Sequence, residues 1–142
     1  MVTKESPTLF RNDINRHISQ IVSTKVMTNA SPWLSSFNTG EVHSIAVSHG
    51  EGKFVVSPEY AKELADNGQI AFVYVDDMGN PTAQSPYNPN GSSYGIEGII
   101  SKDGLILGKM GHSERYEENL FKNISGEKVQ QIFVNAVNYF KK

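Results

Sequence analysis

The sequence predicts an α/β domain in which helices pack on a mixed β-sheet. The run at 70–76, "IAFVYVD", is continuously apolar, as expected of a strand buried on both faces. Two segments, 58–67 and 127–142, repeat apolar residues at helical spacing. A chain of 142 residues is long enough for one hydrophobic core. A sheet covered by at least two helices is typical of the α/β class.

The first part of the chain predicts an arm followed by three strands. Residues 1–16 are polar and lack a period, so we interpret them as a polar arm or the remnant of an upstream segment, and 17–142 as the domain. The stretch 17–28 is rich in Ile, Val and Thr, which favours a half-buried strand. After a break with Pro, Asn and Gly, 42–48 predicts a second strand and 53–57 a short third one.

The helix at 58–67 is predicted by its two ends as well as by its period. Ser57 is a good N-cap, and Pro58 suits the first helical position. Asn67 and Gly68 favour a left-handed end. The expected apolar face consists of Tyr60, Ala61, Leu64 and Ala65.

The second half of the chain begins with an irregular stretch and ends in a helix. Residues 77–95 show no period, and a segment of this length inside a compact domain is either functional or misread. "IEGIIS" and "LILGKM" flank Asp103 and Gly104, a strong hairpin signal. The helix predicted at 127–142 would place on its apolar face Val129, Ile132, Phe133, Ala136, Val137 and Phe140.

Composition excludes several classes of function. Lys and Arg number 13 against 15 Asp and Glu, so there is no basic field to attract nucleic acid. No apolar run has the length of a signal peptide or a membrane span, which leaves a cytoplasmic location by default. The absence of Cys excludes disulfides, thiolate metal sites and a cysteine nucleophile within these residues.

His112 and Glu114 are the first candidate catalytic pair. They follow a predicted strand and lie two residues apart, so in extended chain the carboxylate can reach the imidazole ring. A histidine held in this way is a general base for a Ser or Cys nucleophile, yet no serine here lies in a strand-turn-helix elbow. The alternative interpretation is that both are solvated loop residues, since an isolated H-x-E pair is a weak motif.

A second pair, His49 and Glu51 in "SHGEG", also follows a predicted strand. Ligands collect outside the carboxyl ends of strands in open α/β sheets, so the two pairs can meet at one site. Two imidazoles and two carboxylates are also a possible divalent metal site for hydrolysis, although zinc usually favours a tighter histidine spacing. The "NPNGSS" stretch at 88–93 can offer backbone N–H groups to an anion, or simply form two turns.

Several separated motifs together resemble a known family. "RHISQIVSTKV", "SPWL", "VSHGEGKFV", "YVDDMGNPT", "YNPNGSSYGIEGI" and "GKMGHSERY" occur in this order. They resemble the C-terminal part of the glutamine amidotransferase domain of phosphoribosylformylglycinamidine synthase, from about His17 to Tyr116. The resemblance implies an incomplete class I glutamine amidotransferase domain of flavodoxin-like fold.

The resemblance also implies roles for the histidine turn. The family uses a Cys, His, Glu triad, so His112 would be the base, Glu114 its orienting carboxylate and Arg115 the arginine of the motif. This chain departs from the family pattern M-P-H-P-E-R, because Gly111 and Ser113 replace the two prolines. Losing two rigid residues is expected to loosen the turn that aims the histidine.

The implied activity is glutamine hydrolysis in purine biosynthesis. Ammonia would pass to a synthase part that uses ATP and Mg²⁺ to amidate formylglycinamide ribonucleotide, and no cofactor is expected on this chain. The glutamine pocket would involve His49, Gly50, Asn90 and Gly91. The nucleophilic cysteine is expected in residues that precede Met1, so the isolated chain is predicted to be inactive.

The implied partners are glutamine, the missing amidotransferase half and the synthase domain, with neither nucleic acid nor membrane. A sheet cut in half exposes edges and apolar faces, which predicts self-association. A rival interpretation from another class is a non-catalytic binding module that has kept the half-fold.

Overall fold

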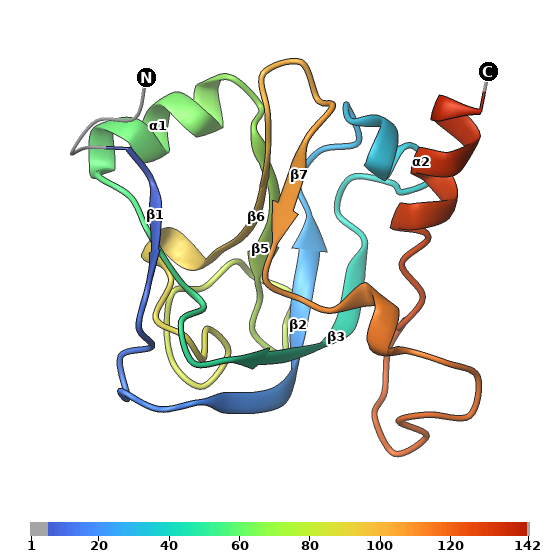
Figure 1. Cartoon of the computed structure of the whole chain (residues 1–142). Coiled ribbons are helices and arrows are strands. Elements are labelled where there is room, and N and C mark those ends of the chain that lie inside the picture. The colour runs from blue at the N-terminus through green and yellow to red at the C-terminus, as the bar shows by residue number, and fades with distance from the viewer. Residues whose placement is uncertain (1–5, 142) are drawn as a thin grey trace.

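The computed structural model describes residues 6–141, which form two antiparallel sheets and two helices (Figure 1). The larger sheet has five strands in the order β3-β2-β5-β6-β7, and the smaller one pairs β1 with β4. The strands are β1 (Thr8–Phe10), β2 (Ile18–Val26), β3 (Val42–His49), β4 (Lys53–Val55), β5 (Ile70–Tyr74), β6 (Ile96–Ile100) and β7 (Leu107–Lys109). The helices are α1 (Pro58–Asp66) and α2 (Ile132–Phe140).

The central strand β5 is buried on both faces, as its sequence predicts. Ala71 and Phe72 pack in one hydrophobic cluster with Ile132 of α2, whereas Ile70 packs against a second cluster that contains Leu64 of α1. Figure 1 accordingly shows the two helices at opposite sides of the sheet. The run does not alternate strictly between the two clusters, because the pairing of β5 with β6 shifts register between Ile70 and Phe72.

The α/β class is confirmed, but the sheet differs from the mixed one that was expected. Each pairing between the described strands of the larger sheet is antiparallel. Parallel neighbours need a crossover, usually a helix, that joins two strands of one sheet. Here α1 follows β4, which belongs to the smaller sheet, so it makes no such crossover.

The predicted cap and hairpin are confirmed. The Ser57 hydroxyl accepts a hydrogen bond from the Tyr60 N–H at 3.2 Å, and Gly68 takes the left-handed conformation after α1. The hairpin β6-β7 pairs Ile100 with Leu107. Its turn places Gly104 at φ 74, where a residue without Cβ is favoured.

The C-terminal helix is shorter than predicted and turned differently. It begins at Ile132 because the preceding segment is extended against β3, where the Glu127 carbonyl accepts a hydrogen bond from the Ser44 N–H at 2.7 Å. Inside the helix, the Asn135 amide donates to the Trp33 carbonyl at 3.0 Å and to Ser36 Oγ at 2.8 Å. This anchor turns most of the predicted face outward, since Ile132 and Ala136 are buried, whereas the following helix residues remain exposed: Phe133, Val137 and Phe140. Val129, the other residue of the predicted face, is also exposed and lies in the segment before the helix.

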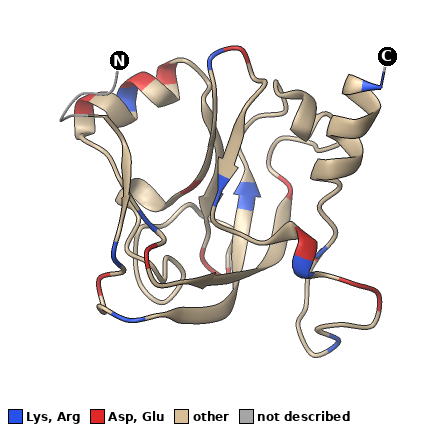
Figure 2. Ribbon diagram, in the orientation of Figure 1, with Lys and Arg blue, Asp and Glu red and all other residues tan. Residues whose placement is uncertain are grey.

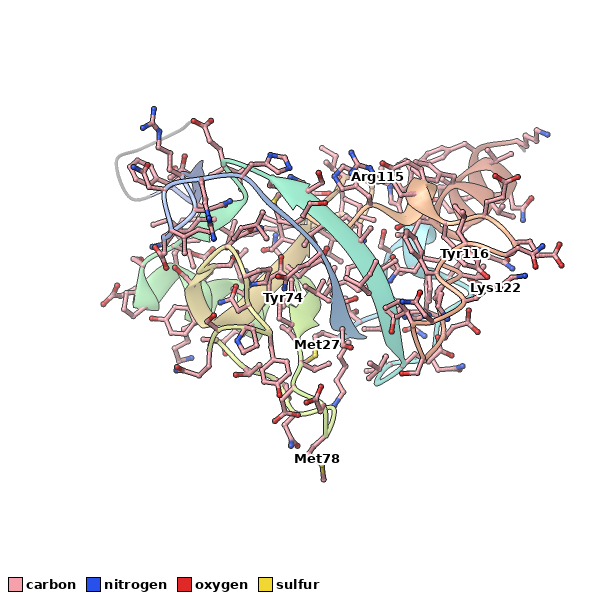
Figure 3. All side chains as sticks on the ribbon, turned by 90° about the horizontal axis from the view of Figure 1, so that it is seen from below. Met27, Tyr74, Met78, Arg115, Tyr116 and Lys122 are labelled. Carbon is pink, nitrogen blue, oxygen red and sulfur yellow. The ribbon has the colours of Figure 1, made fainter. Side chains whose placement is uncertain are left out.

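Two other stretches gain structure that the sequence did not predict. The segment expected as a polar arm contains β1, which pairs with β4, while residues 1–5 of that arm lie outside the described part of the chain. The irregular stretch 77–95 is tied down by Asn88, whose amide donates to the Ser92 carbonyl at 2.8 Å. Figure 3 shows Met78 projecting from this stretch, in contrast to the enclosed Tyr74 of β5.

Candidate functional site

The candidate site forms where the chain leaves β7 and crosses to β3. These two strands are the edges of the five-stranded sheet, yet the His112 N–H donates to the Ala46 carbonyl of β3 at 2.8 Å. The sheet therefore curls, and residues that follow β7 lie beside the end of β3. A 3₁₀ helix, Ser113–Arg115, continues from His112.

The predicted pair of His112 and Glu114 is formed. His112 Nδ1 lies 2.6 Å from Glu114 Oε1, with the two side chains 24% and 54% exposed. Because Nδ1 donates to the carboxylate, the lone pair of the neutral ring belongs to Nε2. Nε2 is buried and has no hydrogen-bond partner among residues 6–141. The ring thus has one nitrogen fixed by an acceptor and the other ready to take a proton.

Glu114 is held in its charged form. Partial burial acts to raise the pKa of its carboxyl group, but its own backbone N–H, the hydrogen bond from His112 and the charges of His112 and Arg115 outweigh it. The pKa of Glu114 therefore lies below its usual range. A carboxylate rather than a carboxylic acid faces the imidazole at neutral pH.

His49, at the end of β3, joins the same site. Its ring stacks on that of His112, and its Nε2 lies 2.5 Å from the Met110 carbonyl oxygen. Burial, together with the neighbouring charges of His112, Arg115 and His17, lowers the pKa of His49 against the opposing effect of the Met110 carbonyl. His49 is therefore favoured as a neutral ring that donates from Nε2.

A cavity of about 420 Å³ lies beside these residues, lined by both histidines, Glu114, Trp33 and Phe133 among others. It is large enough for a small polar molecule. A larger, mostly apolar cavity of about 560 Å³ lies between β1 and the β6-β7 hairpin. Neither histidine lines that larger cavity, so we assign the chemistry to the smaller one.

The structure does not bring the proposed metal ligands together. Glu51 is exposed and lies 3.8 Å from Arg11 in an ion pair, measured from Oε1 to Nε. Among residues 6–141, no group of three or more His, Cys, Asp or Glu side chains is arranged to hold a metal ion. The four-residue metal site is therefore wrong for the described part of the chain.

The remaining predicted pocket residues lie away from the His112 cavity. The Asn90 side chain is buried beneath Gly52, where an added Cβ would collide with it. Gly91 takes φ 79 and abuts the Asp13 carboxylate. Gly50 accepts a backbone hydrogen bond from Asn12. Asn90, Gly50 and Gly91 do not line the cavity, and their substrate roles stay predictions.

Sequence reasoning missed three polar residues beneath the histidine turn. The buried Glu97 forms an ion pair with Lys109, which is only partly buried, and the buried Gln130 lies beside the pair. The available signal was a charged residue inside each apolar strand, "IEGII" and "LGK". Such a residue is rarely buried unless it is paired, but the partner becomes visible only when β6 and β7 align.

Comparison with known proteins decides the family. Residues 1–140 match the family described as the CobB/CobQ-like glutamine amidotransferase domain. The chain belongs to this family. The resemblance of the sequence motifs to a glutamine amidotransferase domain is thereby confirmed.

Individual relatives agree with this assignment to the amidotransferase family. Phosphoribosylformylglycinamidine synthase subunit PurQ of Chlorobaculum tepidum is 40% identical over 121 residues, covering 85% of this chain and 51% of that protein. The subunit of Chlorobaculum parvum is 38% identical over 121 residues, covering 85% and 47%. That of Synechocystis is 36% identical over 118 residues, covering 83% and 52%. The chain thus spans about half the length of the curated relatives it matches.

A solved structure carries the same arrangement. The chain superposes on a structure titled "Structure of PurLQS from Thermotoga maritima" with a TM-score of 0.70 and 27% sequence identity. The match covers 94% of this chain and 53% of that one. This places the described strands and helices within a class I glutamine amidotransferase fold. Across residues 6–141, none of the helices has both the length and the apolar character that crossing a bilayer requires.

Proposed function

We propose that this chain forms part of the glutamine amidotransferase of a phosphoribosylformylglycinamidine synthase. The observation that carries the proposal is the 2.6 Å contact between His112 Nδ1 and Glu114, which leaves Nε2 as the proton acceptor. The relatives that match this chain are subunits of that synthase. The pair has the geometry that a base needs to activate a cysteine nucleophile.

The proposed steps assign one proton acceptor and one orienting group. His112 Nε2 takes the proton from a cysteine thiol that lies outside the 142 residues. The thiolate attacks the side-chain amide carbon of glutamine, and Nε2–H returns its proton to the leaving nitrogen, which departs as ammonia. Water then attacks the glutamyl thioester with Nε2 as base, releasing glutamate and the thiol. Glu114 stabilises the imidazolium in each step.

The wider assignment is part of the same proposal. Ammonia passes to a synthase part that uses ATP and Mg²⁺, and the reaction takes place in the cytoplasm. His49 supports the glutamine site because it stacks on His112 beside the cavity. Gly50, Asn90 and Gly91 support the site more remotely. Gly50 directly follows β3, and the buried Asn90 side chain, next to Gly91, packs against Gly52 of the same loop.

The proposal is tested by supplying the missing half. The part of the Chlorobaculum tepidum subunit that this chain does not match is fused to the chain, and glutamate release from glutamine is measured. We expect turnover by the fusion and none by the isolated chain. The variant His112→Ala should lower kcat by about 10²-fold or more. The exposed control Glu118→Gln should leave kcat unchanged.

Two results would overturn it. Equal turnover by the fusion and by its His112→Ala variant would remove His112 from catalysis. A well-folded fusion that binds the synthase subunit but hydrolyses no glutamine would favour the non-catalytic binding module.

A further inference from the structure

An ion pair between the buried Glu97 and the partly buried Lys109 lies beside the turn that carries His112. Lys109 Nζ is 3.5 Å from Glu97 Oε1, and the two side chains are 11% and 0% exposed. Burying two charges is costly unless each of them also finds hydrogen-bond partners. The partners of this pair include Gly111 and Ser113, the residues on either side of His112.

The ion pair holds the turn at several points. Glu97 Oε1 accepts a hydrogen bond from the Gly111 N–H, and Lys109 Nζ donates to the Gly111 carbonyl at 2.8 Å and to Ser113 Oγ at 3.3 Å. Gln130 Oε1 accepts from Lys109 Nζ at 3.1 Å and from Ser113 Oγ at 2.8 Å. Hydrogen bonds therefore fix both Gly111, which precedes His112, and Ser113, which follows it.

These two fixed positions are those at which the family pattern has prolines. Proline has no N–H, so a proline at position 111 could not donate to Glu97. A Cβ at Gly111 would collide first with Ile45 Cγ2 of β3, and it would also lie 2.8 Å from Glu97 Oε1 and 2.9 Å from Lys109 Nζ. The contacts of the ion pair and a proline at position 111 exclude each other in this arrangement.

We propose that Glu97 and Lys109 are positioning residues, which hold the turn from Gly111 to Ser113 and so keep the His112 ring against Glu114. They supply through buried hydrogen bonds the rigidity that two prolines would supply through their rings. The catalytic consequence rests on the proposed function, but the positioning of the ring is measurable without turnover.

The readout is the tautomer of the His112 ring in the 142-residue chain. Long-range ¹H–¹⁵N correlation spectra at alkaline pH, where imidazole is neutral, distinguish the Nδ1–H form from the Nε2–H form. In the unmodified chain we expect the Nδ1–H form, because Nδ1 donates to Glu114. A side chain with a merely structural role elsewhere would not move this signal.

The test variant removes both charges together, as Glu97→Leu with Lys109→Met, so that neither is left buried alone. We expect the Nε2–H fraction of His112 to rise several-fold. The matched control removes an exposed Glu–Lys pair, Glu63→Leu with Lys102→Met, whose charged atoms lie 3.3 Å apart. The control should keep the Nδ1–H form.

A rescue variant separates positioning from general destabilisation. Position 113 opens the short 3₁₀ helix, where proline is tolerated. Adding Ser113→Pro to the apolar double variant should restore the Nδ1–H form of His112. If the double variant does not fold, Gln130→Met, which removes one acceptor shared by Lys109 and Ser113, is read in the same way.

An unchanged His112 tautomer in a folded variant that lacks the pair, or in Gln130→Met, would overturn the proposal. Turnover of the fusion protein keeps the two proposals apart. Loss of the Nδ1–H form together with a lower kcat and an unchanged KM for glutamine supports both. If the unmodified fusion protein shows no turnover, and its variant without the ion pair still loses the Nδ1–H form, the positioning role is supported and the proposed function is rejected.

Discussion

The imidazole rings of His49 and His112 stack with their centroids 4.9 Å apart and an angle of 14° between their planes. One ring comes from the end of β3 and the other from the turn after β7. Two cations in this arrangement would repel each other, which is one reason why the pKa of His49 is lowered, after the larger effect of burial.

The first prediction follows from that lowered pKa. The unfolded chain binds a proton at His49 near the ordinary pKa of about 6.5, whereas the folded chain binds it only at lower pH. The stabilisation is therefore complete above that value and is lost as the pH falls through the folded-state pKa. We expect a lower Tm at about pH 5.5 than at about pH 7.5, and a smaller difference between them in His49→Gln.

Its control is His17→Gln, which removes an exposed ring. This variant should keep most of the difference in Tm, because the charge of His17 is the smallest of the effects that lower the pKa of His49. Buried His43, whose pKa is also lowered by burial, should leave a residual acid sensitivity in His49→Gln. An identical pH dependence of Tm in His49→Gln and the unmodified chain would contradict the prediction.

The second prediction concerns Glu114 and rests on the proposed function. Replacing Glu114 by Gln removes the negative charge that stabilises the His112 imidazolium while keeping the size of the side chain. We expect kcat of the fusion protein to fall by about 10²-fold, with a much smaller change in the KM for glutamine. Steady-state kinetics at neutral pH measure both, with Glu118→Gln as the matched change of charge. A loss confined to KM would assign Glu114 to glutamine binding instead.

The local features of this fold were predictable because neighbouring residues determine them. The Ser57 cap, the Asp103-Gly104 turn and the pairing of His112 with Glu114 each involve residues no more than four apart. For His49 and His112, the sequence predicted only that two strand ends can meet at one site, and it did not predict that the two rings stack. The geometry of the stack depends on the curl of the sheet, which no single segment encodes.

The errors have a common physical cause, namely tertiary contacts that outweigh local preference. The segment before Ile132 has a helical period, but its backbone pairs with Ser44 of β3 instead. Asn135 then sets the rotation of α2 through two hydrogen bonds to the 3₁₀ region near Trp33. Likewise, the pairing of Glu97 with Lys109 depends on the register of β6 against β7.

The third prediction measures one of those local features. Ser57→Ala removes the hydroxyl that accepts from the Tyr60 N–H at the start of α1. We expect the free energy of unfolding to fall by about 1 kcal/mol, measured by urea titration. Ser57→Thr keeps an acceptor oxygen and should lose much less. Equal losses in the two variants would mean that the hydrogen bond contributes little.

The fourth prediction concerns the exposed surface of α2. Phe133, Val137 and Phe140 are 56%, 47% and 57% exposed, and Figure 2 shows no charged residue within the helix. The sheet edges expected to drive association are less available: the β3 edge is partly covered by His112 and Glu127, and β7 is only three residues long. We therefore expect the uncharged apolar surface of α2, rather than a sheet edge, to drive the predicted self-association.

Sedimentation velocity of the isolated chain over a range of concentrations tests this surface. We expect the weight-average mass to rise with concentration, and the double variant Phe133→Gln with Phe140→Gln to reduce that rise. Met78→Gln is the control, because Met78 is 84% exposed on a separate loop and should leave association unchanged. A monodisperse monomer at every concentration, or equal association of the α2 variant and the unmodified chain, would show that this surface does not bind a second copy. In the fusion protein, the same double variant tests whether the supplied half covers this surface of α2. If it does, the variant should lower the stability of the fusion protein; if it does not, the stability should stay the same.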